Sequence, residues 1–543
     1  MESTMQEVPL TLTELFHHGR RVFGSSEVVT WEGGHARHST FHEVAARVER
    51  LAAGLRSLGV QPGDRVGTLS WNRQEHFEAY FAVPCMGAVL HTLNLRLPPH
   101  QLAQIVNHAA DRVIIVDASL VPLLAAIRPH LPTVEHVVVV GGGDHGDALG
   151  EHIAYEDLLT RSAGGFEWPE LDERSAAAMC YTTGTTGDPK GVAYSHRSMY
   201  LHAFAVWGAF RLSDRERVLA IVPMFHVNAW GTPYAAWMLG ADLLLPDRFL
   251  HADGICSFIQ AERPTFTGGV PSIFSGMLAY FRENHPDVSS LKRAVCGGSA
   301  VPASLIEAFR DELDIELIQA WGMTETSPIG TIAYPPRDTP PEDEMRYRVK
   351  TGRAVPGVAL RILDEDGSEV ERDGVAVGEI EVRGPWITGS YYNASAPEKF
   401  HDGWLKTGDV GNIDPLGFVQ ITDRSKDVIK SGGEWISSVE LENLLMGHEA
   451  VADAAVVGVP DEKWQERPLA VVVFRPGASA TPDDLRAYLG DSVVRWWLPE
   501  RWAFVDEIPK TSVGKQDKKK IRADYAAGTI EAVQVATSGA PVR

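Results

Sequence analysis

The sequence predicts an α/β protein with a large N-terminal region of parallel sheets, a β-rich subdomain and a small, mobile α+β C-terminal domain. Three observations lead to this expectation. Short apolar runs alternate with helical patterns, strands separated by glycine- and aspartate-rich turns follow, and a charged stretch then precedes a compact helix-and-strand pattern. The 543 residues are also too many for one ordinary domain.

The N-terminal region shows the alternation that is typical of parallel sheets. An amphipathic helix is expected at Phe41–Val60, where apolar residues recur at spacings of three and four and Gly59 serves as the C-cap. Apolar runs of strand length follow it at Val113–Val116, Val137–Val140, Val218–Val222 and Leu243–Leu245.

The chain changes character after about Lys350. Expected strands there are separated by turns such as Asp366-Gly367, which indicates a β-rich subdomain over residues 350–423. The strands are expected at Ala359–Leu363, Gly378–Val382 and Phe418–Ile421.

A second boundary falls in the charged stretch Asp423–Lys430, with a hinge expected at residues 423–427. We therefore expect an N-terminal domain over residues 1–423 and a C-terminal domain over residues 424–543. In the latter, Ser437 and Glu440 have the spacing of a capping box that opens a helix at Val439–Met446. Strands are expected at Val456–Val459 and Leu469–Phe474.

Composition narrows the class of protein. The formal net charge of -22 argues against binding to nucleic acid or to anionic membranes, so any anionic ligand must meet local cations. The four cysteines form no CxxC pair, which indicates a reduced, cytoplasmic protein without a disulfide framework or a zinc site. No apolar run is long enough for a signal peptide or a spanning helix, so no integral membrane association is expected.

The sharpest motif is the glycine- and threonine-rich string Tyr181–Gly191. Its glycines let the backbone approach a ligand closely, its threonines offer hydroxyl donors and its lysine adds a positive charge, which together suit a polyphosphate. The spacing is not that of a Walker A loop. The residues expected to bind phosphate are Thr182, Thr183, Gly184, Thr185, Thr186, Gly187 and Lys190.

This string resembles the phosphate-binding loop of the adenylate-forming superfamily, which contains acyl-CoA synthetases, luciferases and adenylation domains. The resemblance extends over residues 12–525 and is strongest to bacterial medium- and long-chain fatty acid:CoA ligases, at Val222–Trp230 and Ile429–Ser438. It implies that a fatty acid and ATP form acyl-AMP and pyrophosphate, and that coenzyme A (CoA) then takes the acyl group. Mg²⁺ is the implied metal, and a homodimer is the implied assembly.

The segment Gln319–Glu325 resembles the adenine-and-magnesium motif of this superfamily. An aromatic face can stack on a purine, and a carboxylate suits a hard cation. Glu325 and Thr182 are therefore the expected metal ligands. Trp321 stands where the family more often has tyrosine, so stacking is kept while the phenolic hydroxyl is lost. The expected nucleotide contacts are Gln319, Ala320, Trp321, Gly322 and Thr324.

Further nucleotide contacts are implied at three other places. Gly298 and Ser299 follow a short strand and line the adenine pocket by resemblance. Asp409, just after a tight turn, can accept hydrogen bonds from both ribose hydroxyls. Across the hinge, with Lys426 at the pivot, the residues expected to reach the nucleotide in one domain orientation are Arg424, Lys426, Lys430 and Trp435.

The acyl side and the catalytic lysine complete the expected site. By resemblance, His226 and Trp230 border the acyl tunnel, and Trp230 is its gate. Gly298 and Ala300 form one wall of the acyl pocket by the same resemblance. Val227, between the two tunnel residues, is an expected nucleotide contact. Lys515 follows Gly514 on a loop, where an ammonium can bridge the carboxylate and the α-phosphate. The expected catalytic residues are Lys190, Glu325 and Lys515. The loop expected to enter on the CoA side contains Gly432, Gly433 and Glu434.

Alternatives of two classes stay open. An amino-acid-activating domain usually has an aspartate just after the strand–histidine motif, and residues 227–230 contain no acid. An acyl-AMP ligase usually carries an insertion that is not seen here, whereas a luciferase-like or aryl-acid ligase stays possible. A non-catalytic nucleotide-binding regulator is opposed by Lys190, Glu325, Asp409 and Lys515.

Overall fold

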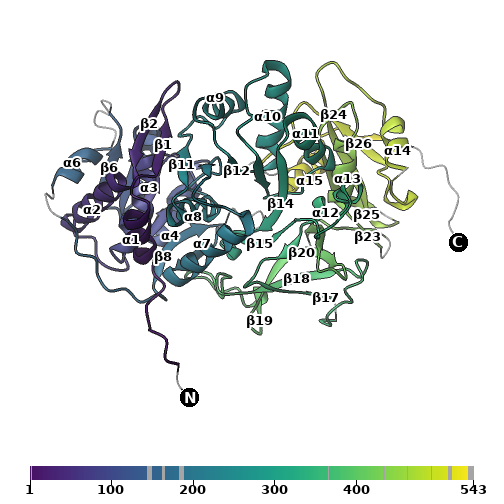
Figure 1. Ribbon diagram of the computed structural model, residues 1–543. Coiled ribbons are helices and arrows are strands. Elements are labelled where there is room, and N and C mark those ends of the chain that lie inside the picture. Colours follow the sequence, from purple (N-terminus) through teal and green to yellow (C-terminus); the bar gives the residue numbers. More distant parts are fainter. Residues whose placement is uncertain are drawn as a thin grey trace.

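The computed structural model describes residues 1, 3–142, 149–161, 165–182, 189–364, 366–424, 426–431, 434–461, 463–490, 492–511 and 516–535, without the side chains of 434 and 435. These residues form four sheets, which follow one another along the molecule from its N-terminal to its C-terminal part (Figure 1). Both α-helices and strands are present throughout, as an α/β protein requires.

The first sheet is parallel except at its last pair of strands, β8 and β9. Its order is β7 (Ile153–Ala154), β6 (His136–Val140), β5 (Asp111–Asp117), β3 (Arg65–Leu69), β4 (Val89–Thr92), β8 (Ala176–Tyr181) and β9 (Gly191–Ser195). The phosphate-loop string therefore joins two antiparallel strands.

The second sheet has a parallel centre and antiparallel ends, where β2 pairs with β1 and β14, β15 and β16 pair in turn. The expectation of largely parallel sheets is thus confirmed, with antiparallel pairs at the edges. Its order is β16 (Arg353–Ala354), β15 (Ile329–Ile332), β14 (Glu316–Gly322), β13 (Arg293–Cys296), β12 (Phe266–Gly269), β10 (Arg217–Leu219), β11 (Asp242–Leu245), β1 (Glu27–Trp31) and β2 (Ala36–Thr40).

The remaining two sheets contain the β-rich segment and the C-terminal part. The β-rich sheet is antiparallel, with the order β17 (Ala359–Leu363), β18 (Gly378–Arg383), β20 (Trp404–Ile413) and β19 (Phe400–His401), and with β21 (Val419–Arg424) also on β20. The C-terminal sheet has the order β23 (Glu434–Ile436), β22 (Ile429–Ser431), β25 (Gln465–Phe474), β26 (Arg501–Phe504) and β27 (Val533–Gln534), and β24 (Val451–Asp461) also pairs with β25.

The α-helices have the following bounds. They are α1 (Leu12–Val22), α2 (Phe41–Ser57), α3 (Gln74–Cys85), α4 (Pro99–Ala109), α5 (Val121–Ile127), α6 (Tyr155–Thr160), α7 (His196–Phe210), α8 (Thr232–Leu239), α9 (Ala252–Glu262), α10 (Pro271–Asn284), α11 (Ala303–Leu313), α12 (Met345–Arg348), α13 (Ser438–Met446), α14 (Pro482–Gly490) and α15 (Lys518–Ala526). Helices α1 to α11 pack on the faces of the two large sheets, whereas α13, α14 and α15 pack on the C-terminal sheet.

Burial alternates along the strands and so creates separate cores. On β5, Val113 and Ile115 join the central core with helices α1, α2, α3, α7 and α8, whereas Ile114 and Val116 pack with α4 and α5. The opposite face of the second sheet packs against α9, α10 and α11. The helices of the central core therefore lie between the two large sheets.

Several expected elements have other ends in the structure, among them the helix expected at Phe41–Val60 and the strand expected at Val218–Val222. Helix α2 begins at Phe41 as predicted but ends at Ser57, because Gly59 has a φ of 86° that ends the helical geometry. The strand expected at Val218–Val222 is β10, which ends at Leu219. In the C-terminal part Ser437 accepts a hydrogen bond from the Glu440 amide at 3.1 Å, as the capping spacing predicts.

The parallel strands bring their carboxyl ends to one edge of the second sheet. Strands β12, β13 and β14 end at Gly269, Cys296 and Gly322, and the residues that follow each of them line one cavity. In the described part of the chain, no helix is long and apolar enough to cross a membrane.

Candidate active site

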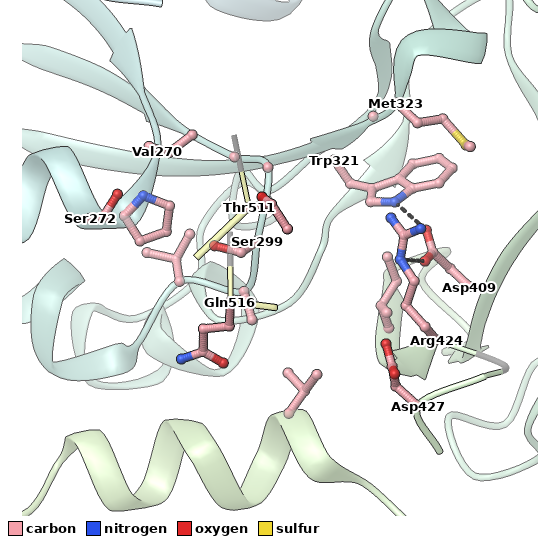
Figure 2. Close-up of a pocket in the computed structure, with 18 of the residues that line it drawn as sticks. Val270, Ser272, Ser299, Trp321, Met323, Asp409, Arg424, Asp427, Thr511 and Gln516 are labelled. Atoms are coloured by element: carbon pink, nitrogen blue, oxygen red, sulfur yellow. Dashed lines mark hydrogen bonds and ion pairs between the residues drawn. The ribbon is translucent and has the colours of Figure 1, made fainter. Parts of the chain in front are cut away.

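A cavity of about 2040 Å³ lies between this sheet edge and the C-terminal part of the chain (Figure 2). It is larger than most single-ligand pockets, which suits more than one substrate. The predicted site residues that line it are Thr182, Lys190, His226, Val227, Trp230, Gly298, Ser299, Ala300, Gln319, Ala320, Trp321, Gly322, Thr324, Glu325, Asp409, Arg424 and Lys426. Residues from six separate segments of the sequence therefore meet in one place.

Some predicted residues lie outside the described part of the chain. These are residues 183–187 of the phosphate loop, Gly432, Gly433, Lys515 and the side chains of Glu434 and Trp435. Thr511 and Gln516, which flank the Lys515 loop, line the cavity on the side facing Ser299 (Figure 2). Lys430 lies on β22 and is not among the residues that line the cavity.

The phosphate-loop string is closed at its base by two hydrogen bonds. The Thr182 amide donates to the Lys190 carbonyl at 2.9 Å, and the Lys190 amide donates to the Thr182 hydroxyl oxygen at 3.2 Å. The two residues adjoin the paired ends of the antiparallel strands β8 and β9. This geometry holds Thr182 and Lys190 together at the cavity wall.

Glu325 is held by a tyrosine that the sequence did not single out. Its side chain is 7% exposed, and Oε1 accepts a 2.7 Å hydrogen bond from the Tyr391 hydroxyl. The Lys190 ammonium lies 4.8 Å from the centre of the same tyrosine ring. Burial, together with the Glu325 carboxylate, raises the pKa of Tyr391, which keeps its hydroxyl protonated as a donor. Tyr391 thus connects the phosphate-loop lysine to the expected metal ligand.

Trp321 supplies a hydrogen-bond donor through its indole nitrogen. Its indole nitrogen donates to Oδ2 of Asp409 at 2.9 Å, and Nε of Arg424 lies 3.0 Å from Oδ1 (Figure 2). Asp409 raises the pKa of Arg424 by its negative charge. Each carboxylate oxygen keeps a second lone pair, so Asp409 can still accept from ribose hydroxyls. The indole N–H therefore gives this position a polar contact of its own, although the phenolic hydroxyl of a tyrosine is absent.

Packing fixes the plane of Trp321. A Cβ added to Gly330, on the neighbouring strand β15, would lie 2.5 Å from the indole, so the ring rests directly on the glycine backbone. Beside it, the buried Gln319 presents an Oε1 atom that has no hydrogen-bond partner among the described residues. A buried amide oxygen without a hydrogen bond lowers the stability of the folded protein, and the exocyclic amine of adenine could donate the missing hydrogen bond.

The acyl-side segment has an unusual backbone. Residues Val227, Asn228, Ala229 and Trp230 have φ values of 44°, 47°, 50° and 58°, and form the left-handed turn η3 (Val227–Gly231). Such geometry costs roughly 1–2 kcal/mol per residue, and strain of this kind is concentrated at ligand-binding sites. The turn places the Trp230 ring beside two glycines. A Cβ atom added to Gly268 or to Gly297 would lie 3.5 Å from the ring, which is an ordinary van der Waals contact. Trp230 therefore lies across the ends of β12 and β13.

Local cations line the cavity despite the acidic composition. Burial lowers the pKa of Arg96 and of Lys426, because both guanidinium and ammonium groups lose water there. The cationic residues at the wall are Arg96, Lys190, Lys399, Arg424, Lys426, Lys510, Lys518, Lys519 and Arg522. The cavity can therefore receive phosphates.

Sequence reasoning missed several of these residues because they belong to no recognisable motif. Tyr391 is one of two adjacent tyrosines in a loop, which gives no signal of its own. His108 on α4 also lines the cavity, and its Nδ1 lies 2.7 Å from the hydroxyl of Tyr181 at the start of the phosphate loop. Arg96 and Gln104 reach the same wall.

Known proteins are similar in sequence to this chain over nearly its whole length. The AMP-binding enzyme family matches residues 16–392, and the AMP-binding enzyme C-terminal domain matches residues 440–515. A long-chain-fatty-acid–CoA ligase of Thermus thermophilus is 46% identical over 533 residues, which are 96% of this chain and 97% of that protein. A 3-methylmercaptopropionyl-CoA ligase of Ruegeria lacuscaerulensis is 43% identical over 534 residues, 97% and 99% of the two chains.

A solved structure also matches closely. The crystal structure of an anthranilate CoA ligase in complex with anthranoyl-AMP superimposes with a TM-score of 0.88 at 27% identity, covering 97% of this chain and 100% of that one.

Proposed function

Because this chain belongs to the AMP-binding enzyme family and is an acid–thiol ligase that works through an acyl-adenylate, we propose that its acid is a medium- to long-chain fatty acid. The observation that carries this proposal is the apolar part of the cavity wall. It is contributed by residues 222–230, 269–273 and 328–329, and those that line the cavity include no lysine, arginine, aspartate or glutamate. Such a wall suits an uncharged chain and gives no partner to an α-amino group.

The first half-reaction is positional and electrostatic. We propose that the carboxylate attacks the α-phosphorus of ATP and releases pyrophosphate, while Lys190 and Lys515 stabilise the charge that develops. Trp321 and Gln319 hold the adenine, and Asp409 holds the ribose. The hydrogen bond from Trp321 to Asp409 joins the base and ribose contacts into one unit.

The residues present fit a magnesium ion that arrives with ATP. No group of three or more histidine, cysteine or acidic side chains in the described ranges could hold a metal alone. Glu325 and Thr182 would therefore hold the ion together with the phosphates, which is how Mg²⁺ is usually bound. When bound, the ion neutralises phosphate charge. Tyr391 orients the Glu325 carboxylate for this contact.

The second half-reaction requires another arrangement of the same cleft. We propose that residues 424–543 rotate about the hinge at 423–427, so that Lys515 withdraws and the loop at 432–434 enters beside the CoA thiol. The thiol sulfur then attacks the acyl carbonyl carbon, and AMP leaves. The contact of Thr511 and Gln516 with the nucleotide cavity supports the adenylate-forming arrangement for the present structure.

The identity of the acid can be measured directly. We expect kcat/KM to be highest for a fatty acid between hexanoate and octadecanoate when such acids are compared with 3-methylmercaptopropionate, indoleacetate, anthranilate and amino acids. The physical reason is that each methylene group buried against the apolar wall contributes about 0.8 kcal/mol of favourable binding free energy. A maximum on 3-methylmercaptopropionate or on an aromatic acid would contradict the proposal. Absence of pyrophosphate release with every acid would favour a non-catalytic regulator.

Trp230→Ala should broaden the choice of acyl chain. Removing the indole opens space over Gly268 and Gly297 that a few methylene groups can fill. The ratio of kcat/KM values between acids of neighbouring chain length should therefore fall, on the order of 10-fold. The KM for ATP should change little. Trp464→Ala, which replaces a half-buried tryptophan that packs on Trp496 and does not line the cavity, is the matched control. An unchanged chain-length profile with only the ATP constant altered would count against a gate.

We further propose a cytoplasmic homodimer. Tyr200, Phe204 and Trp207 form an exposed aromatic row on α7, with Phe204 40% and Trp207 43% exposed. Exposed apolar patches of this kind favour association between proteins. Light scattering should give about twice the chain mass of 59.4 kDa, and a monomeric mass would contradict the assembly.

A further inference from the structure

Both ends of the Lys515 loop are tied to one carboxylate. Asp453 lies on β24, where Nζ of Lys510 is 3.3 Å from its Oδ2 and Nε2 of Gln516 donates to its Oδ1 at 3.1 Å. Gln516 also donates to the Ala454 carbonyl at 2.7 Å. Lys510, Gln516 and Asp453 all line the nucleotide cavity. One side chain of the sheet therefore holds the residues on either side of the loop.

The loop leaves and returns at a closed stem. Lys510 and Gln516 face each other in an antiparallel bridge, and the Asp517 amide donates to the Pro509 carbonyl at 2.8 Å. Asp517 then caps α15, since its side chain accepts from the Lys520 amide at 3.0 Å. The stem holds Lys510 and Gln516 together, whereas Asp453 fixes where this stem stands relative to β24.

A β-bulge gives Asp453 its direction. The register of β24 against β25 shifts between Val451 and Asp453, so an extra residue is inserted just before the aspartate. Bulges commonly re-aim one side chain beside an active site. The ion pair itself is partly exposed, with 25% of the Asp453 and 38% of the Lys510 side chain accessible, so it adds little to stability. Its position points to a role in the reaction.

We propose that Asp453 is a positioning residue for adenylation, which acts by holding the Lys510–Gln516 stem so that Lys515 reaches the reacting phosphate. It also neutralises the Lys510 ammonium, which keeps a second cation on the same loop from competing for the carboxylate or the phosphate. This inference rests on the proposed catalytic role of Lys515, because Asp453 is not assigned any contact with substrate.

The test is a double-mutant cycle in which the two half-reactions are measured separately. Asp453→Ala should slow acyl-AMP formation, since a displacement of about 1 Å at a catalytic group costs on the order of 10- to 100-fold. The same variant should still convert supplied acyl-AMP and CoA to acyl-CoA. Asp453→Asn keeps the acceptor for Gln516 but loses the charge, so it should show a smaller loss. In a Lys515→Ala background, Asp453→Ala should cause no further loss of adenylation.

Asp461→Asn is the matched control for adenylation. Asp461 ends the same strand and pairs with Arg501 at 3.0 Å, away from the residues that line the cavity. Equal damage to both half-reactions, unchanged adenylation in Asp453→Ala, or an added loss in the Lys515→Ala background would each overturn the proposal. Normal adenylation in Lys515→Ala alone would instead refute the proposed role of that lysine. If Asp453→Ala does not fold, Asp453→Asn and Gln516→Leu replace it in the same double-mutant cycle with Lys515→Ala.

Discussion

Lys515→Ala should slow acyl-AMP formation by roughly 100-fold or more, because losing one preorganised charge contact costs about 3 kcal/mol of transition-state stabilisation. The lysine lies outside the described residues, but Thr511 and Gln516 bracket it at the wall of the nucleotide cavity. If it acts only in adenylation, the variant should still turn synthetic acyl-AMP and CoA into acyl-CoA at a normal rate.

The measurement supplies acyl-AMP to the folded variant and follows thioester formation, alongside pyrophosphate release from ATP and fatty acid. Lys520→Ala is a suitable control, since this neighbouring lysine pairs with Asp524 at 2.9 Å and does not line the cavity. Equal loss of both half-reactions in Lys515→Ala would show that domain alternation does not operate as proposed.

Glu325→Gln should also abolish most of the adenylation activity, with a loss on the order of 100-fold or more, while the fold persists. The amide keeps the shape of the side chain and can still accept from Tyr391, but it removes the charge that would hold Mg²⁺. Tyr391→Phe should give a smaller loss that higher Mg²⁺ concentrations partly restore, because the carboxylate is then intact but less well oriented.

Magnesium titrations of pyrophosphate release separate these effects. Glu312→Gln is the control, since this carboxylate pairs with the exposed Arg282 and does not line the cavity. Near-normal pyrophosphate release by Glu325→Gln at ordinary Mg²⁺ would remove Glu325 from the metal site.

Motifs predicted which residues lie near one another, whereas periodicity predicted the elements but not all of their ends. Residues near Thr182, Trp321 and Asp409 could be placed together because each belongs to a string with its own chemistry. The apolar run Val218–Val222 gave the right strand but the wrong end, since apolar character continues into the irregular segment that precedes η3. A run of apolar residues does not report where hydrogen-bonded pairing stops.

Contacts between motifs could not be predicted from the sequence. The bond from Trp321 to Asp409 and the bond from Tyr391 to Glu325 join residues 88 and 66 positions apart. The left-handed turn at Val227–Trp230 was equally hidden, because none of these residue types favours positive φ in isolation except Asn228. Tertiary packing overrides local preference at these positions, as is common at functional sites.

The most direct test of the account is a single-turnover reaction with ATP, Mg²⁺ and a fatty acid such as dodecanoate, first without CoA. The account predicts that the dodecanoyl adenylate and pyrophosphate appear in equal amounts on the enzyme, and that adding CoA then yields dodecanoyl-CoA and AMP. Formation of ADP and phosphate, or the absence of any adenylate until CoA is present, would contradict it.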